Sequence, residues 1–143
     1  MKSKTKSKFI KVVINTCHGG FSLSPKAIEK IAERKGKKCF FFKSTIKDGK
    51  MTSVKIKGYP TGMYWMASSV EDMNKFDYKK HNLPSRPEDR TDPDLVAVVE
   101  ELGKEANGTY SELKVVEIPS DVKWHISEYD GDEWVAENHR TWS

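Results

Sequence analysis

The sequence predicts an α/β (α+β) fold, a single compact domain with a mixed β-sheet and two helices. Two segments combine a helix-start signal with apolar residues at helical spacing, which is typical of amphipathic helices. Several short runs are rich in β-branched or aromatic residues, and two Asp-Gly pairs lie between such runs, as in β-hairpins. A chain of 143 residues can bury a core as one domain. The predicted order is β-α-β-β-β-α-β-β-β.

The first strand and the first helix have clear boundaries. Residues 1–8 alternate Lys with Ser or Thr, so we expect a disordered basic tail and assign residues 9–143 to the domain. Phe9–Ile14 is nearly all apolar, which is typical of a strand buried on both faces. Ser24-Pro25 is a good N-cap and first helical residue, and Lys35-Gly36 ends this helix.

The middle of the chain predicts a hairpin followed by a long connection. Asp48-Gly49 separates the strands expected at 40–46 and 51–56. A short strand is expected at 63–66. Residues 70–91 are charged and lack periodicity, so we expect a long surface connection, a kind of segment that is often functional.

The last third predicts a helix and three strands. Asp92 is the expected N-cap and Pro93 the first residue of a helix that continues through Gly103 to Asn107-Gly108. Gly103 is expected to weaken the interior of this helix. The remaining strands are expected at 113–118, 122–129 and 133–136, with Asp130-Gly131 as the turn of a second hairpin.

The charge is divided unevenly along the chain. Residues 1–57 hold 16 Lys or Arg against three acids, a balance of +13, whereas residues 58–143 have a balance of −9. The net charge of +4 favours anionic partners. One alternative function is therefore nucleic-acid binding through the tail and the lysines at 37, 38, 43, 47, 50, 55 and 57.

Composition also bears on the compartment. No apolar run reaches the roughly 20 residues that span a bilayer, and no signal-peptide pattern follows the basic start, so we expect a cytoplasmic protein without a membrane partner. Cys17 and Cys39 are expected to be free thiols in that compartment. The sequence does not predict an oligomeric state.

The segment Asn15–Phe21 is the candidate ligand site. A strand that ends in a polar, glycine-containing turn before a helix is where α/β domains usually bind ligands. The amides of Gly19 and Gly20 suit an anion, although neither dinucleotide nor P-loop motif is present. An aromatic run near the C-terminus is expected to complete the site. The predicted ligand-binding residues are Asn15, Thr16, Cys17, Gly19, Gly20, Phe21, Tyr129, Trp134, His139 and Arg140.

The same loop allows an enzyme as an alternative. Cys17 would be the catalytic nucleophile, and the Gly19 and Gly20 amides would stabilise an oxyanion. Adjacent residues of an extended chain point to opposite sides, so His18 is poorly placed to act on Cys17, and His125 or His139 would have to serve as the base. The Cys and His residues lack metal-ligand spacing, and we expect neither a metal nor a cofactor.

Four motifs carry a resemblance to a known family. They are Val-Ile-Asn-Thr-Cys-x-Gly-Gly-Phe-x-Leu-Ser at 13–24, Arg-Thr-Asp-Pro-Asp-Leu-Val at 90–96, Val-Val-Glu-Glu-Leu-Gly at 98–103 with Ala-Asn-Gly at 106–108, and the closing 128–142. With these motifs the chain resembles an uncharacterised family of small proteins from tailed phages and large DNA viruses. That family has no assigned activity, so no functional residue carries over. The resemblance implies a viral accessory protein acting in the host cell cytoplasm.

These observations lead to one leading hypothesis. We expect a non-enzymatic viral binding domain whose partner is an anionic small molecule, such as a nucleotide, or a host protein. The cysteine-dependent enzyme and the nucleic-acid binder remain the alternatives.

Overall fold

A computed structural model describes residues 8–62 and 64–138 of the chain. The predicted tail at 1–8 lies outside these ranges except for Lys8. In chain order the elements are β1 (Phe9–Asn15), α1 (Pro25–Arg34), β2 (Phe40–Lys47), β3 (Lys50–Lys55), β4 (Trp65–Ser68), η1 (Met73–Lys75), α2 (Tyr78–His81), α3 (Pro93–Leu102), η2 (Gly103–Ala106), β5 (Leu113–Pro119), β6 (Trp124–Tyr129) and β7 (Asp132–Glu137). Helices and strands are mixed as predicted, which confirms the α+β class.

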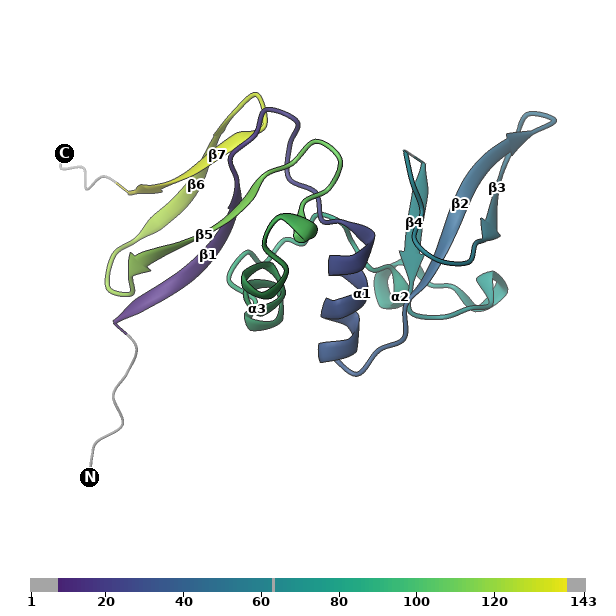
Figure 1. The fold of residues 1–143 in the computed structure, drawn as a ribbon, viewed down its shortest axis with the longest axis horizontal. Coiled ribbons are helices and arrows are strands. Elements are labelled where there is room, and N and C mark those ends of the chain that lie inside the picture. Colours follow the sequence, from purple (N-terminus) through teal and green to yellow (C-terminus); the bar gives the residue numbers. More distant parts are fainter. Residues whose placement is uncertain (1–7, 63, 139–143) are drawn as a thin grey trace, which may run out of the picture.

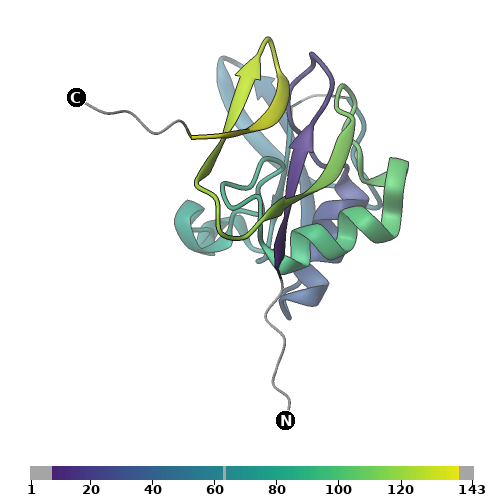
Figure 2. The ribbon, with the colours of Figure 1, turned by 90° about the vertical axis from the view of Figure 1, so that its left-hand side faces the viewer.

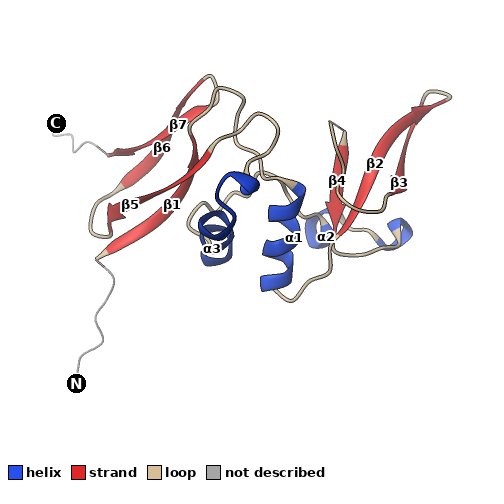
Figure 3. Ribbon diagram, in the orientation of Figure 1, coloured by secondary structure: helices blue, strands red, loops and turns tan. Residues whose placement is uncertain are grey.

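The strands form three small antiparallel sheets instead of one mixed sheet. β1 pairs with β5, β6 pairs with β7, and β2 lies between β3 and β4. The first two sheets lie at one end of the molecule and the third at the other, with α1 and α3 between them (Figures 1 and 3). In Figure 2 the β6–β7 hairpin lies beside β1 and β5.

Both predicted helix starts are confirmed. Ser24 caps α1 by accepting a hydrogen bond from the Ala27 amide at 3.1 Å, and Asp92 caps α3 by accepting one from the Asp94 amide at 3.3 Å. The helix α3 ends earlier than expected. Gly103 has a φ of 59° and caps α3 instead of lying inside it, because this backbone conformation ends the α-helical hydrogen-bond pattern.

Both hairpins turn where the Asp-Gly pairs predict. Asp48 and Asp130 each have a φ of 52°, and the glycines that follow also have positive φ, as type I′ turns require. The strand β4 begins two residues later than predicted. The reason is Tyr64, whose φ of 64° is incompatible with an extended strand. The connection 70–91 contains η1 and the short α2 in addition to loops.

The core lies between the two groups of sheets. Leu95, Val98 and Val99 of α3 pack with Ala27 and Ile28 of α1. Side chains from β1, β2, β4 and the loop before α1 complete the cluster, namely Val13, Phe41, Ala67, Phe21 and Leu23. Only the second half of β1 is buried, so the expectation of a strand buried throughout is wrong for Phe9–Lys11.

Ion pairs also join the two long helices. Arg34 and Lys35 at the end of α1 contact Asp94 at 3.1 Å and 2.9 Å, and Lys35 also contacts Asp92 at 2.8 Å. None of the helices in the described part of the chain has the length and apolar content needed to span a bilayer.

Candidate functional site

The buried Asn15 brings the two halves of the predicted site together. Its side-chain amide donates to the carbonyl oxygens of Cys17 at 2.6 Å and Gly131 at 2.7 Å. Its side-chain oxygen accepts from the Glu112 amide at 2.8 Å. Asn15 therefore ties the loop after β1 to the β6–β7 turn and to the start of β5. The loop and the turn, more than a hundred residues apart in sequence, lie side by side.

The β6–β7 turn is pressed against the loop. A Cβ added to Gly131 would lie 2.4 Å from the His18 carbonyl oxygen and 2.7 Å from the Gly20 nitrogen, so the backbones touch here. The loop touches a second segment as well. A Cβ on Gly19 would lie 2.1 Å from the carbonyl oxygen of Tyr110. The lack of a side chain at Gly19 therefore serves close packing within the fold.

A buried ion pair beneath the loop was not predicted. Arg90 donates from its two terminal nitrogens to the two carboxylate oxygens of Glu133, at 2.7 Å and 3.0 Å. Both side chains are almost wholly buried, with exposed fractions of 9% and 3%. The guanidinium also stacks 3.9 Å from the ring centre of Phe21. One sequence feature could have indicated it: alternation along the strand at 133–136 places Glu133 on the same face as Val135.

The environment of Glu133 keeps it ionised. Burial alone would raise its pKa, but hydrogen bonds from Arg90 and from the backbone N–H of Asn15, with the charges of Arg90 and Arg86, leave the pKa below its ordinary value. The backbone N–H of Asn15 donates to Glu133 Oε1 at 2.9 Å. Arg90 and Glu133 thus form a structural support for the loop, with their polar atoms satisfied within the fold.

The part of the chain that the structure describes shows no basic side chain hydrogen-bonded to Cys17, as the catalytic alternative would require. Cys17 is half-buried, and among the described residues no side chain forms a hydrogen bond with its sulfur. His18 instead lies 3.3 Å from the Asp130 carbonyl oxygen, and His125 contacts Asn138. His139 lies outside the described residues. The role of Cys17 as a nucleophile therefore stays a prediction.

The other thiol is held in its neutral form. Burial, together with the charges of Glu29 and Glu33, raises the pKa of Cys39 to about 12. Both cysteines are free, as expected. Within the described ranges, no group of three or more His, Cys, Asp or Glu residues is arranged to hold a metal ion.

Those of the remaining predicted residues that the structure describes do not converge on one cavity. Phe21 is buried in the core, and Thr16 is bonded to the Glu112 carbonyl through its hydroxyl at 3.1 Å. Tyr129 and Trp134 are exposed on one face of the β6–β7 hairpin, and Glu133 lies on the other face. Arg140, like His139, lies outside the described residues.

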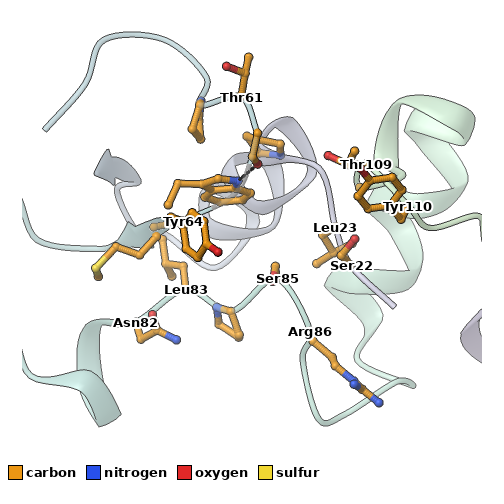
Figure 4. A pocket seen from close by; sticks show the side chains of 18 of the residues that line it. Ser22, Leu23, Thr61, Tyr64, Asn82, Leu83, Ser85, Arg86, Thr109 and Tyr110 are labelled. Atoms are coloured by element: carbon orange, nitrogen blue, oxygen red, sulfur yellow. Dashed lines mark hydrogen bonds between the residues drawn. The ribbon is translucent and has the colours of Figure 1, made fainter. Parts of the chain in front are cut away.

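A groove of about 710 Å³ lies next to the loop and shares Gly19 with it. We call it the tyrosine groove, because Tyr64, Tyr78 and Tyr110 line it while remaining 73%, 71% and 65% exposed. They come from three segments: the β3–β4 loop, α2 and the loop before β5. In Figure 4 Tyr64 and Tyr110 face each other across the groove. Its other lining residues include Ser22, Leu23, Thr61, Trp65, Asn82, Leu83, Ser85, Arg86 and Thr109.

The lining of the tyrosine groove is rich in hydroxyl groups and poor in charge. Among the described residues that line it, no Asp or Glu is present, and Arg86 supplies the charged group. In Figure 4 the Arg86 side chain extends from the floor away from Tyr64. Trp65 is fixed by a hydrogen bond of 3.1 Å from its indole nitrogen to the Gly62 carbonyl. The groove can therefore offer aromatic surfaces and neutral donors to a ligand.

The conformation of Tyr64 is unusual and is held in place by its neighbours. A bulky residue with a φ of 64° is strained, and such strain concentrates at functional sites. The Tyr64 carbonyl accepts a hydrogen bond of 2.8 Å from the Ser44 amide of β2. Sequence analysis missed this groove because its tyrosines are distant in sequence and belong to no periodic pattern.

Comparisons with models of protein families, with curated protein sequences and with solved structures find no match for this chain. The viral origin expected from the resemblance therefore stays a prediction. The function has to be argued from the loop, the tyrosine groove and the surfaces around them.

Proposed function

We propose that the protein is a non-catalytic binding domain for an anionic small molecule with a planar ring, such as a nucleotide, and that this ligand occupies the tyrosine groove. The observation that carries the proposal is the convergence of Tyr64, Tyr78 and Tyr110 on one groove. Large aromatic side chains that stay exposed around a concave surface are typical of binding sites. The volume of about 710 Å³ falls within the roughly 300–1,000 Å³ of small-molecule pockets.

The charges around the groove support an anionic ligand. A lining without a carboxylate among its described residues does not repel a phosphate, and tyrosine and serine hydroxyls can donate to its oxygens. The net charge of +4 adds a favourable long-range field. In this proposal the loop Asn15–Phe21 does not bind the ligand itself. Its buried network holds Gly19 against Tyr110 and so shapes one wall of the tyrosine groove.

The test is titration of the purified protein with AMP, ATP and inorganic phosphate by calorimetry. Two variants remove an aromatic ring from the groove, Tyr110→Ala and Tyr64→Asn, the second because Asn tolerates a positive φ. Tyr129→Ala is the matched control, since Tyr129 is as exposed as Tyr64 but lies on the β6–β7 hairpin.

We expect each groove variant to weaken nucleotide binding at least about fivefold, the lower limit for loss of one stacking contact of 1–3 kcal/mol. The Tyr129 variant should bind as the wild type does. Equal losses in all three variants would contradict the assignment to the groove. A folded protein that binds none of the three ligands would contradict the proposal and favour a protein partner.

A further inference from the structure

Beyond Lys43, the last β2 residue that pairs with β4, the β2–β3 hairpin stands clear of the core and presents both faces to solvent. Beyond the buried Phe42, its described side chains are exposed or half-exposed, including Ile46 at 74% and Val54 at 55%. β3 pairs with β2 alone among the described strands. In Figure 1 this hairpin projects at the side of the molecule opposite to β6 and β7. A two-stranded ribbon of this kind contributes little to the core and is free to contact a partner.

The strand register gives the hairpin one basic face. Lys43 pairs with Val54, Thr45 with Thr52, and Lys47 with Lys50. Because side chains alternate along a strand, Lys43, Val54, Thr45, Thr52 and Lys50 share a face, which we call the basic face. These five residues include two lysines and two threonines and no acid. Two lysines on a face without an acid among these residues favour an anionic partner that would neutralise them.

The lysines of the basic face are available for such a partner. Among the described residues, neither Lys43 nor Lys50 takes part in an ion pair. Lys55, by contrast, lies on the opposite face, where it is paired with Glu71. The register therefore separates a neutralised lysine from the free ones.

The basic face is continuous with the tyrosine groove. Lys43 of β2 pairs with Trp65 of β4, so both lie on the same side of the sheet, and Trp65 lines the groove. The neighbouring Ser44 is bonded to Tyr64 at the groove's rim. One surface thus runs from the lysines of the ribbon, past Trp65 and Tyr64, into the groove.

We propose that this surface binds single-stranded nucleic acid, with the phosphates along the basic face and unpaired bases stacked on the tyrosines of the groove. The proposal rests on the proposed function and names a polymeric ligand for the same groove. A positively charged track beside aromatic side chains is the arrangement by which proteins hold single strands without sequence preference. A duplex suits the groove less well, because its paired bases are not available for stacking on Tyr64 and Tyr110.

The test is fluorescence anisotropy with a labelled oligothymidylate of about twelve nucleotides, within the roughly 4–16 nucleotides that a single-strand-binding OB-fold covers. The variant Lys43→Gln with Lys50→Gln removes two charges from the basic face. The control Lys114→Gln with Lys123→Gln removes two exposed charges from β5 and the segment before β6. Binding is measured between about 0.05 and 0.2 M salt, the range over which phosphate contacts lose affinity most visibly.

We expect the ribbon variant to weaken oligonucleotide binding roughly 25-fold at about 0.1 M salt and to reduce the salt slope by about 1.4, since each phosphate contact on a single strand contributes about 0.7 to that slope. Its affinity for AMP should not change. The control variant should keep the wild-type slope. Thermal unfolding of each variant verifies that it is folded.

Three outcomes would overturn the inference. They are an unchanged salt slope in the ribbon variant, oligonucleotide binding no tighter than AMP binding, and tighter binding of a duplex of the same length. In the first two cases, binding of AMP to the groove would still support the proposed function. If the folded wild type bound neither AMP nor the oligonucleotide, both proposals would be refuted together.

Discussion

Arg90 connects four parts of the molecule through one side chain. Its guanidinium contacts Glu133 of β7, the carbonyls of Val13 and Pro87, and the ring of Phe21. A planar group with five donors can satisfy this set, whereas an ammonium group cannot. The position of the loop after β1 therefore depends on the contact between Arg90 and Glu133, two residues that are far from this loop in sequence.

We expect removal of either charge of this pair to destabilise the protein strongly. Arg90→Met should lower the free energy of unfolding by about 3–5 kcal/mol, because it leaves Glu133 buried and unpaired. Glu133→Gln should have a similar effect through the unpaired Arg90, although the amide oxygen can still accept from Asn15. The double variant should lower the free energy of unfolding by less than the sum of the two single effects. Urea unfolding of the three variants measures this coupling.

An exposed pair provides the matched control. Lys11 and Glu100 are 2.8 Å apart, with both side chains 44% exposed. The corresponding variants, Lys11→Met and Glu100→Gln, should show a coupling below about 1 kcal/mol. Equal coupling in the two pairs would contradict a special role for the buried one.

At the level of elements, the sequence correctly predicted the features that depend on neighbouring residues, namely helix starts and hairpin turns. The start of each long helix follows from a capping side chain and a proline, as at Ser24-Pro25 and Asp92-Pro93. The hairpin turns follow from Asp-Gly pairs that accept positive φ. Pairing between distant strands has no such signal, and this is why one mixed sheet was predicted where β1 pairs with β5 alone.

The candidate site also combines parts that the sequence could indicate with parts that depend on contacts between distant residues. The sequence indicated the loop Asn15–Phe21 and the C-terminal aromatic run as two parts of a ligand site, without showing that they meet. In the structure Asn15 donates a hydrogen bond to the Gly131 carbonyl of the β6–β7 turn. The sequence could not identify the tyrosine groove, whose walls meet only after α1 and the connection 70–91 are in place. The basic face of the hairpin could not be identified either, because the side of the sheet on which its lysines lie together depends on the β2–β3 register.

The two Asp-Gly turns offer a matched test of how elements pack. Gly49 and Gly131 have similar backbone conformations, with φ of 77° and 91°. A Cβ on Gly49 meets nothing within 4 Å, whereas one on Gly131 overlaps the backbone of His18 and Gly20. Gly49→Ala should therefore lower the free energy of unfolding by about 1–2 kcal/mol through strain alone. Gly131→Ala should cost a further 1–3 kcal/mol, roughly, from overpacking.

Urea unfolding of the two variants checks this difference. The loop after β1 should also lose order in Gly131→Ala, which faster amide hydrogen exchange at Thr16 and Gly20 would detect. Equal destabilisation by the two substitutions would show that the β6–β7 turn is not pressed against the loop in solution.

At the scale of the whole molecule, ionised carboxylates join elements that are separate in sequence. Glu133 connects β7 to Arg90, Asp94 connects α3 to the end of α1, and Glu105 of η2 contacts Lys26 of α1. For Asp94 and Glu105, hydrogen bonds from Lys35 and from Lys26 lower the pKa of the carboxyl group. All three carboxylates thus have a pKa below the ordinary value in the folded state.

We therefore expect the protein to be destabilised by acid. A carboxyl group whose pKa is lower in the folded state binds its proton more readily when the chain is unfolded, so it stabilises the fold above its ordinary pKa, near 4. This contribution is lost as the pH falls from there through the lower pKa of the folded state. The midpoint temperature of thermal unfolding should accordingly stay level down to about pH 5 and fall steeply below it.

A high salt concentration distinguishes the contribution of the buried carboxylate to acid sensitivity from that of the exposed ones. At about 1 M salt the exposed pairs of Asp94 and Glu105 are screened, whereas the buried pair of Glu133 is screened much less. The wild type should then keep part of its acid sensitivity in high salt, and Glu133→Gln should lose most of that remainder. A pH profile of Glu133→Gln that parallels the wild type in high salt would contradict this account, because it would assign the acid sensitivity to groups other than the pair that supports the loop.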